Sequence, residues 1–317
     1  MDKTKIAIVG TGGVGGFLGG ELAAFYAADP AVEVYFISRG EALRSIQADG
    51  LRVDTQSRSY VARPALATDD AAAIGPVDYL LYCTKAYDVE AGISQAMPCI
   101  GPQTVVLPFL NGVDSGERIA RMLPRTEVWM GCVYVVAFIV EPGHIAEQTN
   151  GYRYYFGSPD GTPARLAALD GLFVRAGINA RMREDIVRCV WDKFAFISPV
   201  ATVTSYTDLT YGDILSTPEL RGQLLALLDE FKAVAAARGK ELSPDVVEAV
   251  VAQMERIPAD TTTSMQRDFR AGRPTELESL TGYLVREGHR LGVPVPTYER
   301  MYAGLEARAQ AAAGSRR

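Results

Sequence analysis

Residues 5–20 of the 317-residue chain read KIAIVGTGGVGGFLGG, and seven of these sixteen residues are glycine. The short β-branched run at 5–9 is typical of a buried strand, which the first glycine ends. Gly10–Gly15 fit the spacing G-x-G-x-x-G, and the residues that follow predict a helix. A second apolar run at 33–39 predicts another strand. Strand, glycine loop, helix and strand in this order predict a dinucleotide-binding unit.

Each glycine of this motif has a mechanical role. Gly10 permits a tight turn, Gly12 lets the backbone approach a pyrophosphate, and Gly15 lets the helix pack on the strand. The N–H groups and dipole at the helix start then hold the phosphates. The alternative is a glycine-rich helix packed tightly in the core, which does not explain why the glycines begin where the strand stops. The residues expected to bind the cofactor here are Gly10, Thr11, Gly12, Gly13, Val14 and Gly15.

The alternation of strands and helices continues along the first half of the chain. Apolar runs predict buried strands at 77–84, 103–110 and 128–136, with helices between them at 88–100 and 115–123. This order predicts the α/β class with a doubly wound, mostly parallel sheet. Segment 142–157 then predicts short strands with turns, and 162–177 predicts a helix that a glycine ends, followed by an edge strand or loop.

From about residue 186 the patterns are almost all helical. Helices are predicted at 218–239, at 243–257 with Ser243 as its cap, and at 274–292 after a proline. We therefore expect two domains, a Rossmann-type nucleotide-binding domain at 1–184 and an all-helical domain at 185–317.

Composition limits the classes of partner. Hydrophobic residues make up 48% and charged residues 22%, as in ordinary globular proteins, and the net charge of −6 argues against nucleic acid as the main partner. The apolar stretch at 133–140 is too short to span a bilayer. The four cysteines, at 83, 99, 132 and 189, lack metal-binding or disulfide spacing. We expect a cytoplasmic protein without a metal site that binds neither nucleic acid nor membrane.

The end of the second predicted strand bears on the choice of cofactor. An NAD site usually carries Asp or Glu there, to bind the ribose hydroxyls. This chain has Ser38 followed by Arg39, and an arginine suits a 2′-phosphate through paired charged hydrogen bonds. Lys85, just past the strand predicted at 77–84, is within reach of the same phosphate. These residues favour NADP over NAD; the alternative is that Arg39 is an ordinary surface arginine.

An enzyme that reduces a ketone must protonate the new alkoxide. The two histidines, His144 and His289, fit better as structural or surface residues. Lys193 is the only lysine between positions 85 and 232, and its apolar neighbours predict partial burial. Burial lowers the pKa of lysine side chains toward working pH, which makes Lys193 a candidate acid. A lysine that reaches solvent from an amphipathic helix is an equal alternative.

Two further polar residues stand where ligands bind. Asn111 closes the strand predicted at 103–110, and ligands of doubly wound sheets lie beyond the carboxyl ends of the strands. Its amide can meet substrate or nicotinamide; the alternative is a plain Asn-Gly turn. Glu276 opens the helix predicted after Pro274, either as an acid favoured by the helix dipole or as a carboxylate that accepts a substrate hydroxyl.

Together these segments resemble the ketopantoate reductase (2-dehydropantoate 2-reductase) family over almost the whole chain. The resemblance rests on GTGGVGG, CTKAYD, LPFLNGVD, EPGHI, WDKF and the stretch SMQRDFRAGRPTELESLTGYLVREGHRLGVPVPT. The family implies an N-terminal NADP-binding domain, a helical domain like that of 6-phosphogluconate dehydrogenases and an active site between them. It also implies NADPH-dependent reduction of 2-dehydropantoate to pantoate, a step of pantothenate biosynthesis.

The resemblance also implies roles for residues that match the family's motifs. Lys193 matches the general acid, Glu276 the acid that binds the substrate's hydroxyl, and Ser264 the serine that contacts the substrate carboxylate. Asn111 matches the asparagine near nicotinamide and substrate. Arg39 and Lys85 match the basic residues near the 2′-phosphate.

The chain departs from the family at two positions. Ile197 and Ala201 stand where the family often has asparagines that line the substrate pocket. Their loss makes that side of the pocket more apolar and leaves open another branched 2-oxo acid as the substrate. A protein that binds NADP without catalysis is a further alternative. The expected partner is a small 2-oxo acid, and a homodimer stays open.

Overall fold

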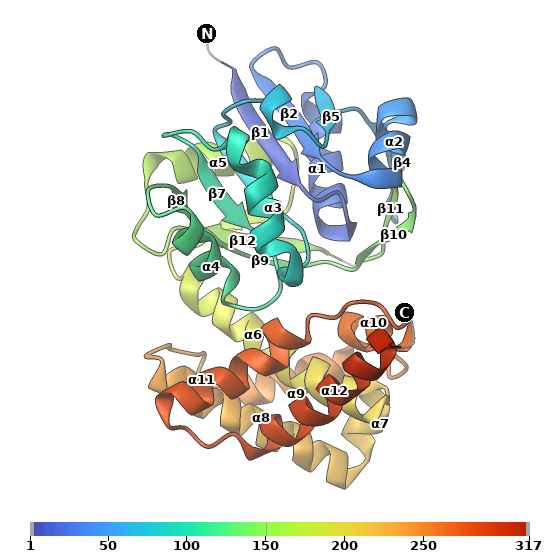
Figure 1. The fold of residues 1–317 in the computed structure, drawn as a ribbon, viewed down its shortest axis with the longest axis vertical. Coiled ribbons are helices and arrows are strands. Elements are labelled where there is room, and N and C mark those ends of the chain that lie inside the picture. The colour runs from blue at the N-terminus through green and yellow to red at the C-terminus, as the bar shows by residue number, and fades with distance from the viewer. Residues whose placement is uncertain (1–2, 150, 315–317) are drawn as a thin grey trace. The chain divides into compact units, whose positions relative to one another are not determined.

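A computed structural model describes residues 3–149 and 151–314. The chain divides into two compact units, Met1–Leu110 with Ser115–Ile186, and Asn111–Asp114 with Val187–Arg317. Strands and helices build the first unit and helices build the second, as Figure 1 shows. No helix within the described ranges is both long enough and apolar enough to cross a bilayer.

The first unit is organised by a six-stranded parallel sheet with the order β5-β2-β1-β6-β7-β8. The sequence alternation predicted this doubly wound α/β arrangement, and the prediction is confirmed. From β1 the chain adds β2 and β5 on one side of this strand, and then crosses over to add β6, β7 and β8 on the other side. The strand order therefore reverses between β1 and β6. Ligands of such sheets bind at this reversal point, beyond the carboxyl ends of the strands. The strands are β1 (Thr4–Val9), β2 (Val32–Ile37), β5 (Leu66–Thr68), β6 (Tyr79–Tyr82), β7 (Val105–Pro108) and β8 (Glu127–Val128).

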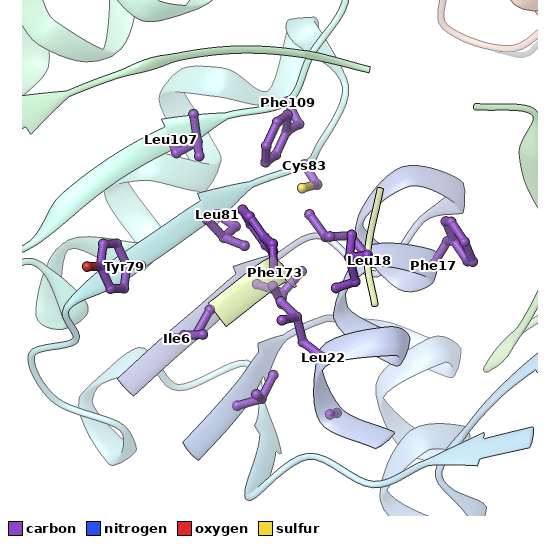
Figure 2. Packing of buried hydrophobic residues seen from close by; sticks show 14 of the residues in the cluster. Ile6, Phe17, Leu18, Leu22, Tyr79, Leu81, Cys83, Leu107, Phe109 and Phe173 are labelled. Carbon is purple, nitrogen blue, oxygen red and sulfur yellow. The ribbon is translucent and has the colours of Figure 1, made fainter. Parts of the chain in front are cut away.

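Helices cover both faces of this sheet. In β1, Ile6 and Ile8 join a core cluster with α1 (Gly13–Tyr26) and α5 (Ala164–Arg175), part of which Figure 2 shows. The alternate residues of β1 join a second cluster on the opposite face, with α3 (Val89–Ala96) and α4 (Ser115–Met122). Burial on both faces explains why the strands read as continuous apolar runs.

Helix α1 lies between the parallel sheet and a second, four-stranded sheet. A Cβ atom at Gly19 would lie 2.9 Å from the ring of Phe36 in the parallel sheet, and one at Gly20 would lie 2.8 Å from Val53 in the second sheet. Ligand approach alone therefore does not explain the glycine-rich stretch, and close helix packing accounts for much of it. The second sheet has the order β10-β11-β3-β4, formed by β3 (Leu51–Asp54), β4 (Ser59–Ala62), β10 (Ala137–Glu141) and β11 (His144–Glu147).

The strand predicted at 128–136 is divided between two sheets. Its start is β8 of the parallel sheet, whereas β9 (Met130–Tyr134) joins a three-stranded sheet with β12 (Arg153–Gly157) and β13 (Ala180–Met182). A Cβ atom at Gly131 would lie 2.7 Å from the ring of Phe109, so glycine permits the close passage where the chain changes sheet. The edge strand or loop predicted after the helix at 162–177 is β13. Helix α2 (Gly40–Asp49) and strands β3 to β5 were not predicted.

The second unit is helical, as predicted. Pro218 opens α8, and Gly239, just past its end, has a φ of +65°. The predicted Ser243 cap is wrong: its N–H and hydroxyl donate to the carboxylate of Asp192 at 2.9 and 2.6 Å, and α9 begins later. The helix predicted at 274–292 begins with a π-helical turn, Glu278–Gly282. The helices are α6 (Ile186–Thr207), α7 (Tyr211–Ser216), α8 (Pro218–Ala237), α9 (Val246–Arg256), α10 (Ser264–Arg270), α11 (Tyr283–Leu291) and α12 (Pro296–Gly314).

Candidate active site

The glycine loop joins β1 to α1 at the reversal point of the parallel sheet. Gly10 has a φ of +87°, and a Cβ atom there would lie 2.8 Å from Cγ2 of Thr84 beyond β6, so only glycine fits. A Cβ atom at Gly12 would meet nothing within 4 Å, which leaves open space beside this backbone. A Cβ atom at Gly15 would overlap the carbonyl oxygen of Gly10, so this glycine lets the helix pack against the strand.

The first turn of α1 has the features of an anion-binding helix start. The opening N–H groups of a helix have no acceptor within it, and here no side chain caps them and no acidic residue occupies the first turn. The first intrahelical bond runs from Gly16 N–H to Gly12 O at 2.6 Å. Gly13 packs against the carbonyl of Ala137, and Val14 is half-buried beside the core. The loop therefore offers backbone groups, rather than side chains, to an anion.

The position that discriminates between cofactors lies at the end of β2. The hydroxyls of Ser38 and Thr11 are both buried and lie 2.7 Å apart, so each is already engaged. Arg39 follows and is exposed; within the described residues its side chain has no hydrogen bond or ion pair. Lys85 is half-buried and precedes the short helix Ala86–Asp88 after β6. Because β2 and β6 flank β1 in a parallel sheet, both basic residues follow strands that end at the edge of the glycine loop.

The second unit brings three of the predicted site residues together. Nζ of Lys193, on α6, donates to Oδ1 of Asn111 at 3.0 Å, and Nδ2 of Asn111 donates to Oε2 of Glu276 at 3.3 Å. Lys193 is 9% exposed and Glu276 is 4% exposed. The alternative of a lysine that reaches solvent is therefore wrong. The amide of Asn111 connects a buried cation to a buried carboxylate, and these two partners fix its orientation.

Glu276 lies directly before a distorted helix start. Its carbonyl accepts the N–H of Leu280 at 3.0 Å, and the π-helical turn Glu278–Gly282 follows. Such turns are rare and occur frequently at functional sites. Sequence reasoning did not find this turn or the α6 hydroxyls that bind it, those of Ser198 and Thr202. The available signal was the run of Ser and Thr within an apolar helix, because buried hydroxyls need partners.

Other predicted substrate residues are not brought into this chain of contacts. Ser264, the first residue of α10, is half-buried. Among the described residues it makes no hydrogen bond to Lys193, Asn111 or Glu276. Its neighbour Thr263 lies 3.1 Å from the hydroxyl of Thr204, about 16 Å along α6 from Lys193 at 1.5 Å per residue. Ile197 and Ala201 follow Lys193 by one and two turns of the helix; the alanine is fully buried.

The histidines take structural places. Nε2 of His144 lies 2.7 Å from Oδ2 of Asp54 across the second sheet, and Nε2 of His289 lies 2.6 Å from Glu299. Across residues 3–149 and 151–314, no group of three or more His, Cys, Asp or Glu side chains is placed to hold a metal ion.

Comparisons with known proteins match both units. Residues 6–161 match the family model for ketopantoate reductase PanE/ApbA, and residues 185–309 match the model for its C-terminal part. The chain belongs to the ketopantoate reductase family. The resemblance seen in the sequence is thereby confirmed, and the chain is an oxidoreductase of this family.

Three relatives of this ketopantoate reductase family member illustrate its range. A 2-dehydropantoate 2-reductase structure from Porphyromonas gingivalis is 40% identical with a TM-score of 0.85, covering 96% of this chain and 99% of that one. The oxidoreductase YkpB of Bacillus subtilis is 27% identical over 95% of this chain and 98% of its own. D-mandelate dehydrogenase, in a ternary structure with NADH and anilino(oxo)acetate, is 22% identical with a TM-score of 0.86 over 98% and 99%, a likeness in fold.

Proposed function

We propose that this protein is an NADPH-dependent reductase of 2-dehydropantoate, or of a closely related branched 2-oxo acid. The observation that carries the proposal is the chain of contacts from Lys193 through Asn111 to Glu276. A buried ammonium and a buried carboxylate, oriented by one amide, provide a proton donor and a hydroxyl acceptor. Membership of the family and 40% identity to a 2-dehydropantoate 2-reductase support the same substrate class.

The residues that would hold the cofactor are those of the glycine loop. The open space at Gly12 and the uncapped N–H groups of α1 would receive the pyrophosphate. Arg39, whose guanidinium has no other described partner, and Lys85 would bind the 2′-phosphate. When bound, the reduced nicotinamide supplies a hydride to the ketone carbon.

The protein's own residues would complete the reduction. As the carbonyl carbon is reduced, its π electron pair moves to the oxygen, and Nζ of Lys193 would give that oxygen a proton. The lysine then regains a proton from water. Oδ1 of Asn111 would keep the ammonium aimed at the oxygen, and Glu276 would accept a hydrogen bond from the substrate's distal hydroxyl. Ser264 would contact the substrate carboxylate.

A different 2-oxo acid is the second candidate, and one residue favours it. Ile197 is half-buried and places an apolar group one turn beyond Lys193 on the same face of α6, whereas Ala201 is fully buried. A substrate side chain without a hydroxyl loses no hydrogen bond to water when it packs against an apolar group, whereas a hydroxylated side chain does. The same fold also carries D-mandelate dehydrogenase, which has a different substrate.

Steady-state oxidation of NADPH tests the proposal. 2-Dehydropantoate is compared with 2-oxo acids that have the same branched skeleton without the hydroxyl and with aromatic 2-oxo acids. We expect the highest kcat/KM for 2-dehydropantoate or for a branched analogue, with NADH a poorer donor. Tight NADPH binding without oxidation by any of these acids would contradict the proposal and favour a non-catalytic NADP-binding protein.

A further inference from the structure

All three members of the Lys193–Asn111–Glu276 chain depend on elements that meet one π-helical turn, Glu278–Gly282. Glu276 lies two residues before the turn, separated from it by Leu277. The loop that carries Asn111 rests on it, since a Cβ atom at Gly112 would lie 3.3 Å from the carbonyl oxygen of Ser279. Helix α6, which carries Lys193, is hydrogen-bonded to the same turn through its buried hydroxyls.

Both backbone polar groups of Leu280 are hydrogen-bonded. Its N–H donates to the carbonyl of Glu276 at 3.0 Å, and its own carbonyl accepts the hydroxyl of Ser198 at 2.9 Å. Ser198 lies on α6, five residues after Lys193, and is fully buried. This single serine therefore ties the helix of the lysine to the backbone that carries the glutamate.

The direction of each hydrogen bond at Ser198 follows from its single proton. Because its hydroxyl donates to Leu280, the hydroxyl of Tyr298, 2.8 Å away, must donate to Ser198. Burial raises the pKa of Tyr298, so its phenol keeps the proton that it donates. One residue along the turn, the hydroxyls of Thr202 and Thr281 lie 2.7 Å apart and add a second tie to α6.

We infer that Ser198 is a positioning residue, which holds the π-helical turn in the register that lets Glu276 and Lys193 reach the same Asn111 amide. The inference rests on the proposed function for its effect on turnover. One residue more or fewer in a helix rotates the preceding residue by about 100°, so a change of register at this turn redirects Glu276. Misplacement by about 1 Å at a reacting group can lower a rate about 100-fold.

The chain offers a matched control on the same helix. Ser205 is also fully buried, and its hydroxyl has no hydrogen-bond partner among the described residues. We expect Ser198→Ala to lower kcat by about 10–100-fold while the Kd for NADPH stays unchanged. Ser205→Ala is expected to change neither. Wild-type turnover in Ser198→Ala, from an active parent protein, would overturn the inference and leave the proposed function intact.

A double-mutant cycle with Glu276→Gln separates positioning from a general loss of structure. If Ser198 acts through Glu276, its removal costs little further activity once the carboxylate is gone. If the loss of kcat in the double variant equalled the product of the losses in Ser198→Ala and Glu276→Gln, Ser198 would act independently of Glu276, and the inference would be overturned. Tyr298→Phe leaves the Ser198 donor bond in place and is expected to lower kcat less than Ser198→Ala.

Amide hydrogen exchange tests the same contact without turnover. In the protein without substrate, the peptide covering 276–284 should exchange faster in Ser198→Ala, whereas Ser205→Ala should match the wild type. Unchanged exchange would overturn the inference whatever the activity. A wild-type protein inactive on every 2-oxo acid would contradict the proposed function, and the exchange result would still decide whether Ser198 holds the turn.

Discussion

Lys193 donates a hydrogen bond of 3.0 Å to Asn111, and the two residues are 82 positions apart in the sequence. Only one end of the amide accepts, so this bond turns Nδ2 of Asn111 toward Glu276. A buried cation needs such partners, because desolvation otherwise disfavours its charged form. The asparagine therefore both holds the lysine and links it to the carboxylate.

Replacement of Lys193 tests its role as proton donor. We expect Lys193→Ala to lower kcat by about 10²–10⁴-fold, the usual contribution of a positioned acid, with little change in the Kd for NADPH. Lys232→Ala removes an exposed lysine of α8 and serves as the control. Stopped-flow or steady-state kinetics and fluorescence titration of NADPH measure the two quantities. Turnover of Lys193→Ala close to that of the wild type would remove the lysine from the mechanism.

Three candidate residues of the site were singled out from the sequence, but the contacts between them were not predicted. Lys193 stood out because it is an isolated lysine among apolar residues, and Asn111 because it closes a strand. That both bind each other depends on tertiary packing, which no local pattern encodes. The π-helical turn after Glu276 was missed because its sequence, ESLTG, has ordinary helical preferences, and it is distinguished by contacts with α6 rather than by propensity.

Arg39 should discriminate between the two nicotinamide dinucleotides. Its exposed guanidinium follows β2, and the hydroxyl of Ser38 beside it is hydrogen-bonded to the hydroxyl of Thr11. Loss of charge-assisted bonds to a phosphate should weaken NADPH binding in Arg39→Ala by about 10–100-fold and leave NADH binding nearly unchanged. Arg44→Ala, on the same helix α2 with a 71% exposed side chain, is the control. Titration of each variant with both dinucleotides decides, and equal weakening would discredit the phosphate assignment.

Acid stability should depend on Asp54. Hydrogen bonds from Ser59, Arg52 and His144 lower the pKa of its carboxyl from 3.8 to about 2. Since the pKa in the folded protein is the lower one, the ionised carboxylate stabilises the fold above about pH 4, and this stabilisation is lost as the pH falls toward about 2. Denaturant midpoints measured across this window should fall more steeply for the wild type than for Asp54→Asn.

The matched control for the acid window is Asp49→Asn, which removes an exposed carboxylate of α2. It is expected to follow the wild-type curve. If Asp54→Asn gave the same slope as the wild type between pH 4 and pH 2, the hydrogen bonds at Asp54 would carry no part of the acid response.

The fold was predicted most completely where its pattern is local. Buried parallel strands read as apolar runs, and helix α8 begins at its proline as expected. The hairpin strands at 51–62 were missed because LRVD and SYVA are short and partly polar, and because the pairing of the first of them, β3, with β11 comes from distant sequence. The glycines of α1 beyond the motif had no predicted role, because the second sheet, against which Gly16 and Gly20 pack, was not foreseen.

Two glycines of the same loop should separate cofactor binding from folding. A methyl group at Gly12 meets nothing in the protein, so Gly12→Ala should keep the wild-type denaturant midpoint. It would occupy the space through which a pyrophosphate approaches, and we expect NADPH affinity to fall by at least about 10-fold.

A methyl group at Gly15 behaves in the opposite way, since it overlaps the carbonyl of Gly10 and lies 2.6 Å from Cβ of Cys83. Overpacking of this kind typically costs about 1–3 kcal/mol, so urea denaturation of Gly15→Ala should show a clearly lower midpoint. Calorimetric titration of both variants with NADPH measures their affinity for the cofactor. Wild-type affinity in Gly12→Ala would move the cofactor away from this loop, whereas wild-type stability in Gly15→Ala would show that helix α1 has room to shift from β1.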